Sequence, residues 1–97
     1  MAYRIKSYSY EQAKKLGVDI APSKTKGKKI DVFKNGEKVA SVGALGMNDY
    51  PTYLEKERDG KVEKGTANRR RKAYKTRHEK DRHSKGTKGY YADKLLW

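Results

Sequence analysis

The chain of 97 residues carries 25 Lys and Arg against 12 Asp and Glu, so its formal net charge at pH 7 is +13, and it contains no cysteine. Without cysteine there is no disulfide framework, thiolate metal site or cysteine nucleophile, and no apolar run approaches the ~20 residues that span a bilayer. The expectation is one soluble domain, without a membrane segment or secretory leader, whose partners are polyanions or acidic protein surfaces.

The apolar content is low for a chain that folds. Leu, Ile, Val and Phe together account for 14 residues, whereas Tyr alone accounts for 8. Disordered chains are poor in aromatic residues, so the tyrosines favour a folded domain. Its core is expected to be small, and a partner is a plausible means of completing it.

The N-terminal segment predicts a short strand followed by a short helix. Residues 3–8 alternate in polarity, and Ser9 with Gln12 three residues later has the form of a capping box. Gly17 is placed to end this helix after two turns. Residues 18–22 are expected to be extended, because a residue that precedes proline avoids the helical region.

A β-hairpin over residues 29–42 is the clearest local prediction. Two β-rich runs flank Asn35-Gly36, and both positions of this turn must accept positive φ, which Asn and Gly do readily. A lone hairpin is only marginally stable. The strand at residues 3–8 and the helix at residues 9–16 are the expected partners that cover it.

A helix is predicted beyond the glycine-spaced loop at residues 43–48. Asp49 or Tyr50 is a suitable cap, and Pro51 suits the first turn because its missing N–H would have no partner there. This helix should end near residues 59–60, where a glycine follows an aspartate.

A second, strongly basic helix is expected to begin at a Thr66 cap and to continue through residue 82. Residues 61–90 hold 12 basic and 3 acidic side chains, an excess of nine, and a mostly polar helix either bridges elements or docks on a charged surface. The predicted fold is a small single α+β domain. Residues 1–60 form a core with an N-terminal β-hairpin or three-stranded sheet and a short helix, and residues 61–97 form a basic C-terminal helical arm with an aromatic tail.

The cations of this helix are the principal candidate site. Arginine's planar fork matches phosphate oxygens, and a contiguous cluster releases counterions when it docks on nucleic acid. The predicted nucleic-acid-binding residues, with one tyrosine that either stacks on a base or packs on the fold, are Arg69, Arg70, Arg71, Lys72, Tyr74, Lys75 and Arg77. The competing interpretation is a solvated helix face, which the self-repulsion of so large an excess charge disfavours.

The C-terminal segment combines aromatic and apolar side chains. Its candidate interaction residues are Tyr90, Tyr91, Leu95, Leu96 and Trp97. Such a tail either folds back to complete the core or serves as a docking peptide, since Trp and Tyr concentrate at interface hot spots. The first of these two interpretations is favoured.

Catalytic and metal sites are not expected. His78 and His83 lie five residues apart, which departs from the zincin spacing of four and places them on different sides of a helix. The acids are scattered rather than clustered as hydrolysis of phosphodiesters with Mg²⁺ requires. The sequence therefore predicts neither an enzyme, a cofactor, a metal nor a small-molecule substrate.

Segments along nearly the whole chain resemble a family of small basic proteins encoded by large nucleocytoplasmic DNA viruses that infect algae and amoebae. The segments that carry this resemblance are residues 6–10, 13–18, 28–32, 49–53, 70–74, 77–78 and 89–97. The family is a domain of unknown function, so it assigns no role to any single residue. The resemblance implies a viral source and a place in the virion, with passage through the host cytoplasm or nucleus during infection.

Three functions are compatible with these observations. The favoured hypothesis is a non-enzymatic virion protein that binds nucleic-acid phosphates without reading base sequence. The first alternative is a minor capsid or cement protein whose basic arm docks on acidic surfaces of larger capsid proteins. The second is an accessory factor bound to RNA or to a ribosome.

Overall fold

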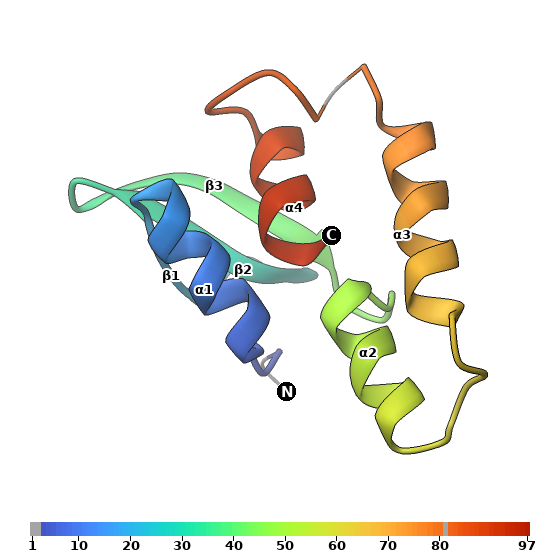
Figure 1. The fold of residues 1–97 in the computed structure, drawn as a ribbon. Coiled ribbons are helices and arrows are strands. Elements are labelled where there is room, and N and C mark those ends of the chain that lie inside the picture. Colours follow the sequence, from blue (N-terminus) through green and yellow to red (C-terminus); the bar gives the residue numbers. More distant parts are fainter. Residues whose placement is uncertain (1–2, 81) are drawn as a thin grey trace.

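The computed structural model describes residues 3–80 and 82–97, which form an α+β domain (Figure 1). The elements follow in the order α1 (Ser7–Leu16), β1 (Asp19–Pro22), β2 (Lys28–Lys34), β3 (Glu37–Ala44), α2 (Tyr50–Arg58), α3 (Thr66–Arg77) and α4 (Lys88–Leu96). The predicted fold class is confirmed.

The sheet is antiparallel with strand order β1-β2-β3. The β2–β3 hairpin turns at Asn35 and Gly36, whose φ values are 54° and 82°, so the predicted two-residue turn is confirmed. The third strand is β1, in which Ile20 pairs with Val32 of β2. The prediction that residues 18–22 are extended is thus confirmed for β1.

The prediction of a strand over residues 3–8 is wrong. Helix α1 already begins at Ser7, with Lys6 as its cap. Ser9 is therefore inside the helix rather than at its cap, and its buried hydroxyl donates to the main-chain oxygen of Leu95, at 2.6 Å. The predicted capping hydrogen bond does not form. A buried hydroxyl needs an acceptor, and α4 supplies one in the Leu95 oxygen. Gly17, with φ 71°, ends the helix as predicted.

The core lies between the sheet and two helices, α1 and α4, which Figure 1 shows side by side against the strands. Ile30, Val32 and Val42 of the sheet are fully buried, and Leu95 and Leu96 of α4 are at most 1% exposed. At the edge of this core Gly43 lets α4 approach β3, since an added Cβ would lie 2.8 Å from Leu96 Cδ1. The core thus draws on both of the segments that the sequence analysis separated at residue 60.

The start of α2 agrees with the sequence prediction. The Asp49 side chain accepts the amide N–H of Thr52, at 3.0 Å, and Pro51 occupies the first turn. Asp49 is 1% exposed and also forms a 2.8 Å ion pair with the buried Lys29. Burial, followed by the charge and the hydrogen bond of Asp49, raises the pKa of the Tyr3 hydroxyl that donates to this carboxylate. Asp49 thus both caps α2 and links this helix to β2 through Lys29.

Helix α3 is shorter than predicted and starts differently. Thr66 is its first residue, and Gly65 is the cap, with no side-chain hydrogen bond of its own. Glu57 of α2 instead accepts the N–H groups of Gly65 and Ala67, both at 2.7 Å. These backbone hydrogen bonds lower the pKa of Glu57. The expected continuation through residue 82 is wrong, because α3 ends at Arg77 and Arg82 instead approaches Asp93 of α4.

Candidate nucleic-acid interface

Three of the seven predicted binding residues turn toward α4 and hold α3 in place. The Arg71 Nε donates to the main-chain oxygen of Trp97 at 2.6 Å, and its guanidinium lies 4.8 Å from the centre of the Tyr50 ring. The Tyr74 ring stacks on Trp97, with centroids 4.4 Å apart and planes 6° apart. It also stacks on His78, at 4.3 Å. Tyr74 is therefore a packing residue of the α3–α4 contact.

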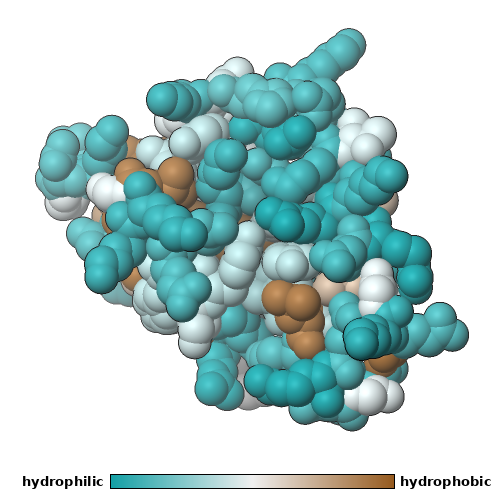
Figure 2. Space-filling view, in the orientation of Figure 1, coloured by the Kyte–Doolittle hydropathy of each residue, from teal (hydrophilic) through white to brown (hydrophobic). Residues whose placement is uncertain are grey.

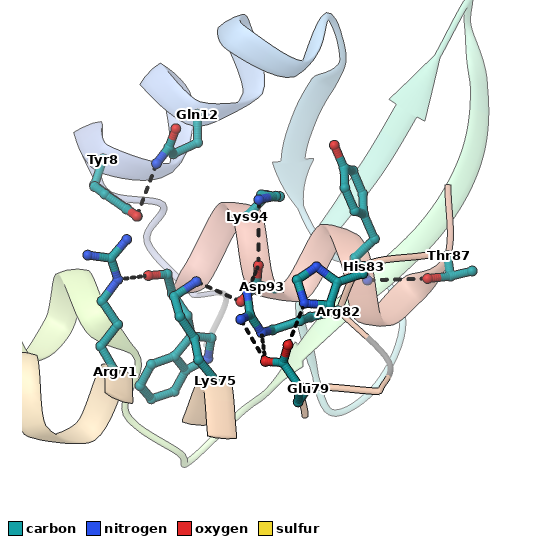
Figure 3. A network of polar contacts seen from close by, with 12 residues as sticks. Tyr8, Gln12, Arg71, Lys75, Glu79, Arg82, His83, Thr87, Asp93 and Lys94 are labelled. Carbon is teal, nitrogen blue, oxygen red and sulfur yellow. Dashed lines mark hydrogen bonds and ion pairs between the residues drawn. The ribbon is translucent and has the colours of Figure 1, made fainter. Parts of the chain in front are cut away.

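The third of these residues, Lys75, binds a fully buried carboxylate. Its ammonium lies 2.8 Å from Asp93 Oδ1, and Asp93 is 0% exposed. Figure 3 shows Lys75, Arg82 and Lys94 converging on this carboxylate from α3, the loop after α3 and α4. Arg82 and Lys94 reach only 3.8 and 3.9 Å from Oδ2, which has no hydrogen-bond donor among the described residues. Asp93 thus anchors α3 on α4 mainly through Lys75.

The other four predicted residues, Arg69, Arg70, Lys72 and Arg77, have exposed side chains. None of them forms an ion pair with a carboxylate in the part of the chain that the structure describes. Arg70 and Arg77 share one side of α3, because they are seven residues, or about two turns, apart. Lys72 lies on the opposite side, along a groove shared with Lys75. The predicted cluster is therefore split between two sides of the helix.

Arg70 and Arg77 border a cleft of about 360 Å³ between α3 and the ends of β2, β3 and α4. Among the described residues, its cationic lining consists of Lys28, Lys29, Arg70 and Arg77, and Asp49 is the one acidic side chain in it. Since Lys29 and Asp49 neutralise each other at 2.8 Å, three unbalanced cations remain. The rest of the lining includes apolar side chains (Ala73, Ala92, Leu96, Met47) and aromatic side chains (Tyr53, Tyr74, Trp97), together with Gly43, Ala44, Asn48 and His78.

A lysine pair beside this cleft was not predicted from the sequence. The pKa of Lys28 is lowered, first by contact with the Lys88 side chain and then by its charge. The two side chains are therefore close enough to interact, and neither forms an ion pair with a described carboxylate. Lys28 begins β2 and Lys88 begins α4, so no local pattern reveals that they meet.

Of the predicted interaction residues, Tyr91, Leu95 and Leu96 are core residues, with exposed fractions of 5%, 0% and 1%. Tyr90 and Trp97 are partly buried and pack against that core. The C-terminal segment thus folds back onto its own domain. Trp97 nevertheless keeps a surface on the cleft.

The surface seen in Figure 2 is almost entirely hydrophilic, with only small separate hydrophobic areas. No helix of the described residues is long and apolar enough to cross a membrane. Comparison of the chain with protein-family models, curated proteins and solved structures finds no match. The chemistry of the cleft and of the exposed cations is therefore the basis for any functional assignment.

Proposed function

We propose that this protein is a non-enzymatic component of a virus particle that binds nucleic acid through its phosphates, without base-specific recognition. The observation that carries the proposal is a group of four cations, of which Arg70, Arg77 and Lys28 line one cleft and Lys88 interacts with Lys28. Within the described chain these four cations have no carboxylate partner, whereas Lys75 does. The viral source rests on the sequence resemblance alone.

Electrostatics favours a polyanion over plain solvent exposure. The Lys88 side chain lowers the pKa of Lys28, first through its contact and then through its charge, and a phosphate bound near both lysines would favour their charged forms. Arginine side chains bind phosphate oxygens with two parallel hydrogen bonds. The net charge of +13 adds long-range attraction toward any polyanion.

The salt dependence of nucleic-acid binding tests the proposal. For duplex DNA, log K should fall linearly with log salt concentration. The double variant Arg70→Ala/Arg77→Ala should make the slope shallower by roughly 1–2, at ~0.9 for each lost phosphate contact. The matched control is Lys14→Ala/Lys15→Ala, which removes the same charge from exposed positions on α1 and should change the slope less.

Two results would contradict the proposal. Equal slopes for the two double variants would mean that general charge, rather than the cations at the cleft, drives binding. Absence of binding at low salt would exclude the nucleic-acid function and favour docking on an acidic capsid surface. Fractionation of purified particles adds an independent measurement, because a genome-bound protein should leave with the released nucleic acid and a cement protein should stay with the emptied shell.

A further inference from the structure

The cleft has a lining that phosphate binding alone does not require. Backbone phosphates are hydrated anions, and exposed cations on a convex helix suffice to hold them. Here three unbalanced cations surround an interior in which Ala73, Ala92 and Leu96 are apolar. This combination of charged and apolar lining suits a ligand that has one anionic part and one apolar, planar part.

Single-stranded nucleic acids have this combination. Proteins that bind them pair a positively charged groove, which follows the backbone, with aromatic side chains on which bases stack. In this cleft Tyr53 and Trp97 are the aromatic side chains available to a base, because the Tyr74 ring is already stacked on Trp97 and His78. Arg70 and Arg77 provide the charge. Bases inside a duplex are already stacked and paired, so they enter such a cleft only after extrusion.

The size and position of the cleft are suitable for one base. Its volume of about 360 Å³ falls in the range of small-ligand pockets, about 300–1,000 Å³. Arg70 and Arg77 lie on its α3 side and Lys28 on its β2 side, so cations flank the cleft from two elements. A strand that places a base inside can therefore place its neighbouring phosphates on both sides.

We infer that this cleft receives an unpaired base of a single-stranded nucleic acid, with the flanking phosphates against Arg70, Arg77 and Lys28. The inference rests on the proposed function and narrows it, because it makes single strands the preferred ligand. Base identity is not read, since stacking tolerates every base.

Trp97 is a built-in reporter, because it is the only tryptophan of the chain and it lines the cleft. A base that enters should quench its fluorescence. The probes are oligothymidylate, oligouridylate, a duplex of equal length and inorganic polyphosphate, which carries the charge without bases. Both single strands should quench Trp97 strongly, whereas the duplex and polyphosphate should bind in a salt-dependent manner with little quenching.

A variant that fills the cleft tests the site itself. Ala73 is exposed on α3 and lines the cleft, so Ala73→Trp should occupy the space without changing charge. We expect it to weaken single-strand binding roughly tenfold or more, the scale of one lost base stack, and to leave duplex binding unchanged. The matched control is Thr76→Trp, which places the same side chain at an exposed position on the opposite groove of α3.

The outcomes separate this inference from the proposed function. If duplex, polyphosphate and single strands bind equally at the same salt and Trp97 is not quenched, the inference is overturned while phosphate binding stands. If no nucleic acid binds at low salt, the proposed function fails as well. The quenching measurement uses the unaltered protein, so it decides the matter even if Ala73→Trp does not fold.

Discussion

The contact between Lys75 and Asp93 provides a direct test of the division between structural and exposed cations on α3. Asp93 is 0% exposed, and its hydrogen bond from Lys75, at 2.8 Å, is the one that the described residues provide to its side chain. In Lys75→Met the carboxylate keeps only the looser ion pairs with Arg82 and Lys94, at 3.8 and 3.9 Å. A buried charge therefore loses its main partner.

The expected loss of stability is about 3 kcal/mol, since removing one partner of a buried pair costs roughly 3–5 kcal/mol and the two remaining cations compensate in part. Total stability of a small domain is only about 5–15 kcal/mol. With a urea dependence of about 1–3 kcal/mol per molar, the unfolding midpoint should fall by roughly 1–3 M. Circular dichroism during urea titration measures this shift.

Two comparison variants make the result specific. Lys72→Met removes the same charge from an exposed position on the same helix and should change stability by no more than about 0.5 kcal/mol. Lys75→Met/Asp93→Asn should be more stable than Lys75→Met alone, because the neutral amide is less costly to bury without a cation. Equal stability of Lys75→Met and Lys72→Met would refute the assignment of Lys75 as an anchor.

Three further changes have defined outcomes. Gly36→Val should lower the melting temperature clearly, because φ of 82° is unfavourable for a β-branched residue, whereas an unchanged melting temperature would contradict the tight turn. Leu95→Ala should cost about 2–5 kcal/mol in urea unfolding, because Leu95 is fully buried, and a loss below ~1 kcal/mol would mean that α4 is not part of the core. Burial alone would raise the pKa of Asp31, but hydrogen bonds from Ser23, Ser41 and the Lys24 amide bring it from 3.8 down to about 2. The stability that this carboxylate contributes is therefore complete above its unfolded pKa of 3.8 and should be lost as pH falls toward about 2, so the acid sensitivity of the protein should be weaker in Asp31→Asn.

Local stereochemistry explains the features that the sequence predicted correctly. Asn35 and Gly36 tolerate positive φ, so the hairpin turn was visible from two residues. Asp49 and Pro51 suit the first turn of a helix for reasons internal to that turn. The fold class followed from such signals, because each depends only on neighbours within a few positions.

Tertiary contacts decided the remaining features. Ser9 does not cap α1 but donates to a buried acceptor on α4, 86 residues away. Glu57 of α2 accepts the first N–H groups at the start of α3 in place of a cap from the local sequence. Neither contact can be predicted from the spacing of residues within a single element.

The candidate site shows the same division. The sequence by itself identified α3 as a dense cluster of cations, because charge is a property of composition. It did not distinguish Arg70 and Arg77 at the cleft from Lys75, which is bound to the buried Asp93. Residue types determine how much charge the chain carries, but only the packing of α3 against α4 determines which cations remain available to a ligand.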